Sequence, residues 1–288
     1  MGQFYALLAV LLFIVSHSQV KILSHFPVEQ VVFIRALGIL CLSIPMMMYL
    51  KIPLLGVDRK KLFFRGALGT IAIFCYFTTL QNLPLANAVV LAQLAPFFAV
   101  FFAGIVLKEK SSFVVYLLFV LALFGVFLIK GPGAVGDSWL YMLGVLGAAF
   151  AAFAYNLVRS LKKTDHPLVV LTWFQYVLLP VSFVGLVFDG GVMPTPKDYS
   201  PIFLIALFSF LAQVCLTLAY QKAEMSKSSS VNFLSIPLSV VVASVFFGES
   251  LSVTQLIGVG VVFSAVTLNT VFRSRIEVFF QSIGQKST

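Results

Sequence analysis

Residues 25–41 read HFPVEQVVFIRALGILC, and they place one arginine, Arg35, inside a run that is otherwise apolar for most of a membrane thickness. A helix needs about 20 mostly apolar residues to cross the hydrocarbon core of a bilayer, and the run from 28 to 50 is long enough. The whole chain has this character, because 60% of its 288 residues are hydrophobic and only 10% are charged. Soluble domains carry about 25% charged residues, so the composition predicts an all-α membrane protein.

The charges divide the chain into membrane-spanning segments. All 10 acidic residues lie at the ends of apolar runs or between them, which is expected because a carboxylate in hydrocarbon is costly. Cutting the chain at charges, prolines and glycine clusters leaves ten runs, so we expect ten transmembrane helices. These runs cover residues 3–23, 28–50, 62–81, 85–107, 113–130, 139–158, 167–188, 201–221, 228–247 and 252–272.

The distribution of Lys and Arg predicts the orientation of these helices, because positive residues are retained on the cytoplasmic side. If the N-terminus is inside, fifteen of the 19 basic residues fall in cytoplasmic segments, Arg65 among them, and only Lys21, Lys130 and Lys197 fall outside. We therefore expect a multi-pass protein of the cell membrane, a bacterial inner membrane, with both termini cytoplasmic. The same bias accounts for the net charge of +9, so no nucleic-acid partner is predicted.

The second half of the chain repeats the first at an offset of about 140 residues. HFPVEQVVFIRAL (25–37) aligns with DHPLVVLTWFQYV (165–177), which pairs Arg35 with Gln175. LAPFFAVFFAGIVLKEK (94–110) aligns with SIPLSVVVASVFFGES (235–250), which pairs Pro96 with Pro237. Any two stretches of five apolar helices look somewhat alike, but the matched prolines and the nearly constant offset favour a true repeat.

Each half holds five spans, so the second half must enter the membrane with the opposite orientation. The sequence thus predicts two inverted five-helix repeats, residues 1–133 and 137–273, followed by a cytoplasmic tail at residues 274–288. Inverted repeats are an architecture of secondary transporters, in which the solute site lies near the midplane where the two halves meet.

Several short motifs resemble a known family. The spacing PVEQVVFIR (27–35), the span pair YFTTLQNLPLANAVVLAQLAPFF (76–98) and the endings LKEK (107–110) and FFGES (246–250) resemble the drug/metabolite transporter superfamily, in its ten-span EamA-type branch. The resemblance extends from about residue 4 to residue 272. It implies a bundle of two inverted five-helix repeats that carries small metabolites. The first half is similar to carriers of S-adenosylmethionine, and other similar members carry amino acids outward.

Four polar residues are expected to bracket the midplane in two layers. From the helical rise, Arg35 lies about 10 Å and His17 about 9 Å below the outer surface, and their repeat counterparts Gln175 and Asn156 lie at the mirrored level. We expect a water-lined cavity in which Arg35 holds a carboxylate or phosphate through its planar fork. Alternatively, Arg35 extends its long side chain to the headgroups and only anchors the helix. His17 is the candidate for proton coupling.

Three further spans contribute candidate residues. In the ninth span, Ser228, Asn232, Ser235 and Ser239 share one helical face, which either lines a cavity or lets serines bond carbonyls of their own helix. Gln93 lies off the alanine face of the fourth span. Tyr76 and Trp173 could hold an aromatic or cationic solute. The predicted substrate-binding residues are therefore Arg35, Gln175, His17, Asn156, Gln93, Asn232, Tyr76, Trp173 and Ser235.

Motifs of other function classes lack their context or do not occur. GPGAVG (131–136) fits the dinucleotide-binding pattern by letter, but no strand precedes it. The sequence has no Walker loop, no catalytic signature and no metal-ligand spacing. We therefore expect no cofactor and no enzyme activity, and a secondary transporter of a small organic metabolite, amino acid-like or S-adenosylmethionine-like, that works by alternating access. A passive channel and a membrane-embedded enzyme are the alternatives. The expected partners are the metabolite and the lipid bilayer, and a homodimer is left open.

Overall fold

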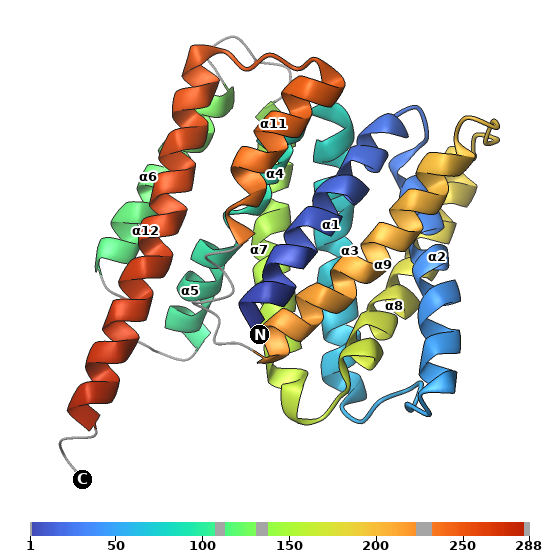
Figure 1. Cartoon of the computed structure of the whole chain (residues 1–288), viewed down its shortest axis with the longest axis horizontal. Helices are drawn as coiled ribbons and strands as arrows, with labels where there is room; N and C mark the ends of the chain where they lie inside the picture. Colours follow the sequence, from blue (N-terminus) through green and yellow to red (C-terminus); the bar gives the residue numbers. More distant parts are fainter. Residues whose placement is uncertain (1, 107–112, 131–137, 223–231, 285–288) are drawn as a thin grey trace.

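The chain folds into a bundle of helices (Figure 1). The computed structural model describes residues 2–106, 113–130, 138–222 and 232–284, and every regular element in these ranges is helical. The helices are α1 (Gly2–Ile22), α2 (Val28–Tyr49), α3 (Arg59–Asn82), α4 (Leu85–Ala92), α5 (Ala95–Val106), α6 (Phe113–Lys130), α7 (Ser138–Ser160), η1 (Leu161–Lys163), α8 (Pro167–Asp189), α9 (Tyr199–Lys222), α11 (Ser235–Phe247) and α12 (Val253–Gly284). The prediction of an all-α protein is confirmed.

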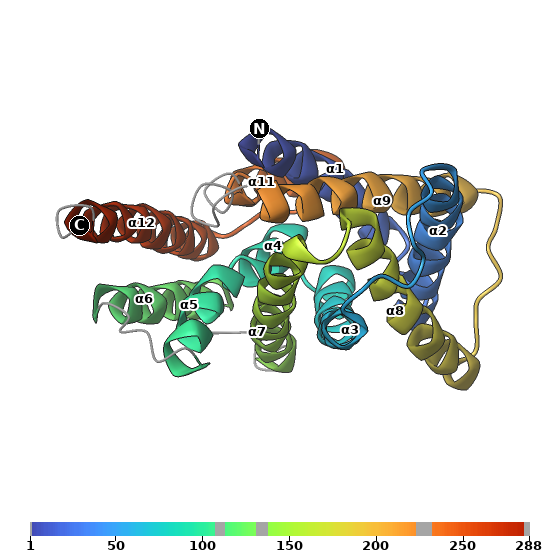
Figure 2. The same cartoon turned by 90° about the horizontal axis from the view of Figure 1, so that it is seen from below.

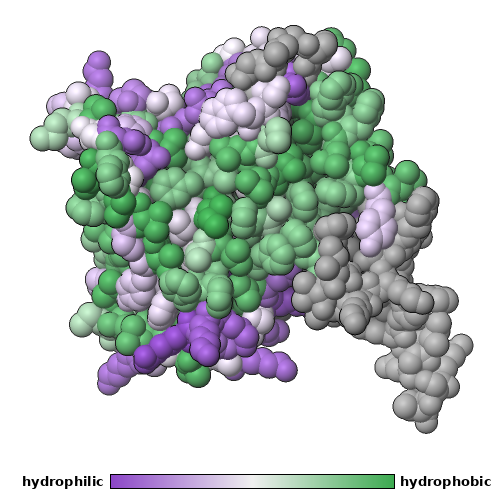
Figure 3. All heavy atoms as spheres, turned by 180° about the vertical axis from the view of Figure 1, so that it is seen from behind, coloured by the Kyte–Doolittle hydropathy of each residue, from purple (hydrophilic) through white to green (hydrophobic). Residues whose placement is uncertain are grey.

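The lengths and composition of these helices suit a bilayer. Within the described ranges, six segments are long and apolar enough to cross a membrane: Gln3–Ile22, Val28–Tyr49, Arg59–Asn82, Ser138–Lys163, Pro167–Asp189 and Tyr199–Gln221. Four shorter apolar helices, Leu85–Ala99, Tyr116–Lys130, Ser235–Phe247 and Val253–Asn269, coincide with the remaining predicted runs. A broad apolar surface covers the middle of the molecule, and polar residues gather toward its edges (Figure 3). Helix α12 continues to Gly284, into the segment predicted as a tail.

The predicted fourth and ninth spans are each interrupted near their middle. Helix α4 ends at Ala92 and α5 begins at Ala95, so Pro96 lies in the first turn of α5. Helix α11 begins at Ser235, so Pro237 lies in its first turn. Proline lacks the N–H that a helix interior requires but is tolerated in a first turn, which explains why a new helix segment starts at each proline.

The two halves of the chain interlock. The most extensive helix contacts among the described residues pair α1 with α9, α3 with α7, α6 with α12 and α2 with α8, and each pair joins the first half to the second. Figures 1 and 2 show α6 and α12 side by side at one edge of the bundle. Their backbones touch there, because a Cβ added to Gly258 would lie only 2.7 Å from the carbonyl oxygen of Gly125.

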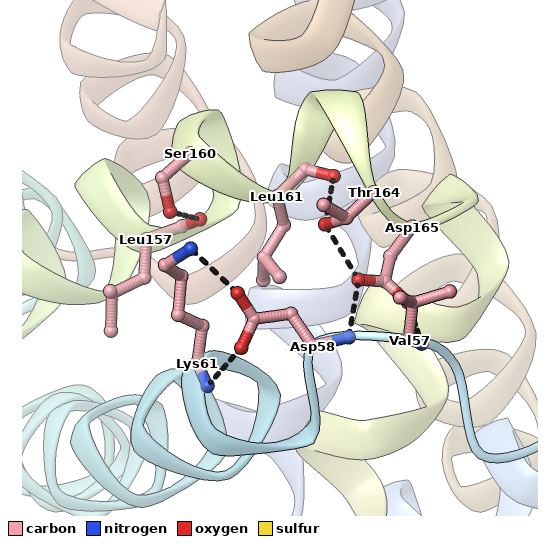
Figure 4. A network of polar contacts seen from close by, with 8 residues as sticks. All are labelled: Val57, Asp58, Lys61, Leu157, Ser160, Leu161, Thr164 and Asp165. Carbon is pink, nitrogen blue, oxygen red and sulfur yellow. Dashed lines mark hydrogen bonds and ion pairs between the residues drawn. The ribbon is translucent and has the colours of Figure 1, made fainter.

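One end of the bundle, here called the Asp165 end, joins the α2–α3 and α7–α8 connections. The Asp165 carboxylate accepts hydrogen bonds from the backbone N–H of Val57 at 2.6 Å, from that of Asp58 at 3.2 Å and from the Thr164 hydroxyl at 2.8 Å (Figure 4). Asp58 also caps α3 by accepting from the backbone N–H of Lys61. Two loops that the sequence assigns to the same side of the membrane therefore meet.

The opposite end is here called the Glu249 end, after Glu249, which follows α11 (Ser235–Phe247). This end joins loops from both halves. His25 pairs with Asp198 at 3.1 Å. The side chain of Gln30 donates to the carbonyl of Val192 at 2.6 Å and accepts from its N–H at 2.8 Å. These contacts connect the α1–α2 loop and the first turn of α2 to the α8–α9 loop, and the sequence places these loops on one side. Helix α1 begins and α12 ends toward the Asp165 end, at the bottom of Figure 1.

Candidate functional site

An internal cavity of about 190 Å³ lies in the middle of the bundle. On α3 its wall runs from Arg65 to Tyr76, which corresponds to about 16 Å along the helix axis. Both halves of the chain contribute, since α1, α2, α3, α4 and α5 face α7, α8, α9 and α11 across it. Six of the nine predicted substrate-binding residues line this cavity: His17, Arg35, Tyr76, Gln93, Asn232 and Ser235.

The two interrupted spans meet at the wall of the cavity. The amide of Gln93, at the break between α4 and α5, donates to the Ser235 hydroxyl at 2.6 Å and to the Asn232 carbonyl at 3.3 Å. The Ser235 hydroxyl in turn donates to the same Asn232 carbonyl at 2.7 Å. The polar side chains therefore bond the backbone groups that the breaks leave free, and so they stabilise irregular backbone at membrane depth. Of the predicted serine face, Ser228 lies outside the described residues, and Ser239 bonds its own helix.

Arg35 is buried at 2% exposure and lies inside the bundle, not at its lipid surface. Its Nε donates to the Ser209 hydroxyl on α9 at 3.0 Å, and Ser209 also pairs with Ser16 on α1 at 2.6 Å. The guanidinium carbon lies 5.8 Å from the ring centre of Phe77 and 5.9 Å from that of Phe174. Its Nη1 finds no hydrogen-bond acceptor within the described ranges. The geometry thus differs from a side chain that reaches outward to the headgroups.

Arg65 is a second buried guanidinium in the same cavity, which the sequence analysis assigned to a cytoplasmic segment. It is 2% exposed, and its guanidinium carbon lies 4.4 Å from the ring centre of Phe174. Its Nε and Nη1 have no acceptor among the described residues. Gly69, one turn further along α3, makes room for it, because a Cβ there would collide with Nη1 of Arg65 and lie 2.9 Å from Cε2 of Phe174.

The cavity carries positive charge without an acidic counterpart. None of its lining residues is Asp or Glu, and the acids whose side chains the structure describes lie at the two ends of the bundle or in the connecting loops. Within the described part of the chain, no group of His, Cys, Asp and Glu could hold a metal ion. The charge that this site offers to a bound molecule is therefore that of Arg35 and Arg65.

Aromatic side chains form the remaining walls. The Tyr76 hydroxyl and His17 Nδ1 are 3.1 Å apart, and the His17 ring stacks on Phe13 with ring centres 5.3 Å apart. Tyr155 and Tyr220 contact each other with ring centres 5.0 Å apart, and the Asn232 amide donates to the Tyr220 hydroxyl at 3.4 Å. A solute in this cavity would meet flat apolar surfaces as well as charge.

Three predicted residues lie outside the lining of this cavity. Gln175 is fully buried between helices, where its Nε2 donates to Leu171 of the same helix at 3.4 Å. Trp173 donates from its indole to the carbonyl of Leu55 at 2.9 Å, so it holds the α2–α3 loop against α8. Asn156 is half-buried near the end of α7 and does not reach the cavity.

A polar cluster closes the bundle at the Glu249 end. Lys21, near the end of α1, pairs with Glu249 at 2.5 Å and donates to the carbonyl of Leu83 at 2.7 Å. Glu249 also accepts from the backbone N–H of Leu85 at 2.8 Å. The pair therefore connects the end of α1, the α3–α4 turn and the segment that follows α11. His17 on α1, Tyr76 on α3 and Ser235 on α11 line the cavity.

Sequence reasoning missed Arg65 and Tyr155. Arg65 lies six residues from the start of α3, which suggested a charge near the headgroups. A signal was present: Arg65, Gly69 and Tyr76 are spaced by four and seven residues, so they share one helical face. The same face carries Ala72 and Ile73, which also line the cavity.

Known proteins resemble this chain along most of its length. The EamA-like transporter family matches residues 1–131 and 138–271. A pseudopaline exporter, CntI, from Pseudomonas aeruginosa (strain UCBPP-PA14) is 28% identical over 256 residues, which cover 86% of this chain and 88% of the relative. A riboflavin transporter from Rhizobium johnstonii is 25% identical over 201 residues, covering 70% and 67%.

Similarity extends to a human protein and to a solved structure. Human solute carrier family 35 member G1 is 27% identical over 268 residues, which cover 86% of this chain and 73% of the relative. One solved crystal structure superposes with a TM-score of 0.69 at 16% identity, covering 96% of this chain and 98% of the other. This last match supports the fold.

Proposed function

The chain belongs to the EamA-like transporter family, and from this premise we propose that it is a secondary transporter that moves a small organic metabolite by alternating access. Membership of this family and the named relatives make it a membrane transporter and not an enzyme. We propose further that it resides in the cell membrane, a bacterial inner membrane, with both termini cytoplasmic.

The observation that supports this proposal best is the cavity between the two broken spans. Discontinuous helices near the midplane are a recurring way to build a solute site in secondary transporters, because the breaks expose polar backbone where a solute can reach it. Here the breaks at Gln93 and Ser235 meet through a direct hydrogen bond of 2.6 Å. A site made jointly by both halves changes shape when one half moves against the other.

The proposed repeats, residues 1–133 and 137–273, supply the motion. If the halves are related by inversion, each can adopt the conformation of the other, so a shape closed at one end implies a shape closed at the opposite end. The pair Lys21–Glu249 closes the Glu249 end here. Alternating access would require this pair to separate in the conformation that opens toward the Glu249 end.

The proposed substrate is a small metabolite, amino acid-like or S-adenosylmethionine-like. A cavity of about 190 Å³ is smaller than the roughly 300–1,000 Å³ of drug-sized sites, which favours a small solute. The relatives are named for different organic compounds, pseudopaline and riboflavin, so their names indicate an organic solute without a common structure.

The experiment that tests the mechanism is counterflow. Purified protein is first screened against a metabolite panel by thermal stabilisation, and the best compound is then used in proteoliposomes. A carrier takes up labelled solute faster when the vesicles are preloaded with unlabelled solute, because the loaded site returns more readily than the empty one. An uptake rate that is the same with and without preloading, or a steady current across a lipid patch, would indicate a channel instead.

Arg35 provides a residue-level test of the same proposal. Arg35→Ala should abolish uptake while the amount of folded protein stays nearly unchanged, because the cavity loses an unpaired donor group. A parallel loss of folded protein and uptake would instead assign Arg35 an anchoring role through its bond to Ser209.

A further inference from the structure

Two guanidinium groups share one aromatic ring inside the cavity. The guanidinium carbons of Arg65 and Arg35 lie 4.4 Å and 5.9 Å from the ring centre of Phe174. Both arginines are 2% exposed, and the buried Nη1 atom of each has no hydrogen-bond acceptor among the residues that the structure describes. Two positive charges therefore lie close together in the interior without a described carboxylate beside them.

No carboxylate of the described chain compensates these two charges. A buried charge is normally paired, because removal from water without compensation costs more than most single interactions return. Contact with an aromatic face compensates only part of that loss. The Ser209 hydroxyl satisfies one donor of Arg35, and no hydrogen bond of the described chain satisfies Arg65. The missing partner is best supplied by a bound molecule.

We propose that the cavity binds an organic dianion, a dicarboxylate or a phosphate monoester, whose oxygens pair with Arg35 and Arg65 together. This inference rests on the proposed transport function but not on the proposed substrate class, because it favours an anionic solute over an S-adenosylmethionine-like one. A dianion matches the charge of the site, and carboxylate and phosphate oxygens match the planar donor fork of arginine. A solute whose only charge is positive would meet repulsion from both groups.

The remaining lining indicates that the anion is organic. Next to the arginines, the cavity presents the apolar side chains of Ile73 and Phe174 and the rings of Tyr155 and Tyr220. An inorganic anion would leave these surfaces uncovered, whereas a carbon skeleton buries them and gains free energy from the contact.

The absence of a side chain at Gly69 leaves the space that the Arg65 guanidinium occupies. A Cβ at residue 69 would collide with Nη1 of Arg65 and would lie 2.9 Å from Cε2 of Phe174. Only glycine leaves space for the guanidinium between α3 and the ring. The chain therefore accommodates this charge in the interior.

The test compares five probes on purified protein in a buffer of low chloride. The probes are glutarate, glycerol 3-phosphate, butyrate, the neutral glutaramide and sulfate, and affinity is measured from thermal stabilisation and by calorimetry. We expect glutarate or glycerol 3-phosphate to bind at least about tenfold more tightly than butyrate, since the second charge meets a second guanidinium. Glutaramide and sulfate should bind far more weakly.

The variants Arg35→Gln and Arg65→Gln test the two groups separately. Each should lower the affinity for the dianion at least about tenfold, because each removes a charge-assisted pair. Arg59→Gln is the matched control, since Arg59 is an exposed arginine at the start of the same helix as Arg65, and it should leave the affinity unchanged. Melting of each variant without ligand shows that it is folded.

Several results would overturn the inference. These are equal affinity for butyrate and glutarate, an unchanged affinity in both cavity variants, or tight binding of sulfate alone. A different result is that a neutral or cationic metabolite stabilises the protein, that no dianion does, and that this metabolite shows counterflow. That result would reject the dianion as substrate and support the transport function. Binding of the dianion together with uptake that does not depend on preloading would support the dianion site and reject the transport mechanism.

Discussion

Replacing Arg65 by Met should stabilise the empty protein. Most substitutions of buried residues destabilise, but Arg65 makes no hydrogen bond to the described chain and lies 2% exposed. Methionine has a similar length, is apolar and can fill the space between Gly69 and Phe174. The variant therefore removes an uncompensated charge and keeps most of the packing.

The size of the effect follows from two opposing contributions. Replacement of buried ionic groups by packed apolar residues is worth from about zero to 4 kcal/mol of stability. The contact with Phe174, at 4.4 Å, contributes about 1–2 kcal/mol in the opposite direction. The difference between the two contributions runs from about −2 to +3 kcal/mol, and we expect Arg65→Met to raise the free energy of unfolding by the central value of about 0.5 kcal/mol.

Arg35→Met is the internal comparison for this prediction. Arg35 shares the burial of Arg65 but donates to Ser209 at 3.0 Å. A hydrogen bond to a charged group is worth about 1.5–3 kcal/mol, so the Arg35 variant should be close to neutral. Ser209 keeps its bond to Ser16 at 2.6 Å, which limits the loss.

The assay is reversible unfolding in mixed micelles with increasing denaturing detergent, in low-chloride buffer and without added metabolite. Arg59→Met, on the exposed first turn of α3, should change the unfolding free energy by less than about 0.5 kcal/mol. A destabilisation by Arg65→Met of more than about 2 kcal/mol would refute the reasoning, because it would mean that the guanidinium is already compensated in the empty protein.

Three further predictions concern the ends of the bundle and the space around the cavity. Glu249→Gln should speed the labelling of a cysteine that replaces Ile73, when the reagent is added from the Glu249 side. The expected increase is about fivefold, since the lost ion pair is worth about 1 kcal/mol. An unchanged rate would show that the Lys21–Glu249 pair does not help to close this end of the bundle. Gly69→Ala should weaken dianion binding about tenfold by displacing Arg65, and an affinity equal to that of the unmodified protein would contradict the crowding there. Hydrogen bonds from the Thr195 hydroxyl and N–H, together with His25, hold the pKa of Asp198 below its usual value, so its contribution to stability is fully present above about pH 4 and is lost as the pH falls below that. Asp198→Asn should therefore flatten the acid limb of a pH-dependent unfolding curve, and an identical limb in both proteins would count against this assignment.

Much of the fold could be predicted from the sequence because a bilayer imposes simple local rules. An apolar run of membrane length must be helical, and its ends must carry the charges. The predicted runs coincide with the observed helices for this reason, and the loops that approach Asp165 are those assigned to one side. Pro96 and Pro237 entered the sequence analysis only as a matched pair of the repeat, and the structure shows that a helix segment begins beside each, since proline acts on its own backbone.

The candidate site was only partly predictable, because a local pattern does not specify which neighbour lies opposite a side chain. Gln93 and Ser235 were found from their helical faces, and the structure brings them to 2.6 Å. Trp173 appeared equally suitable, but its indole reaches a loop carbonyl instead. The rotation of a helix about its axis is set by packing against other helices, which composition does not reveal.

The sequence by itself determined the membrane environment, the helical class and the order of the apolar segments, because each depends on residues adjacent in the chain. Only the tertiary structure decided that Arg35 and Arg65 lie within reach of the same ring of Phe174. These three residues come from three different helices, and an arginine side chain is long enough to point toward the headgroups or into the bundle. Space beside Gly69 and the packing of α3 against α8 select the inward direction.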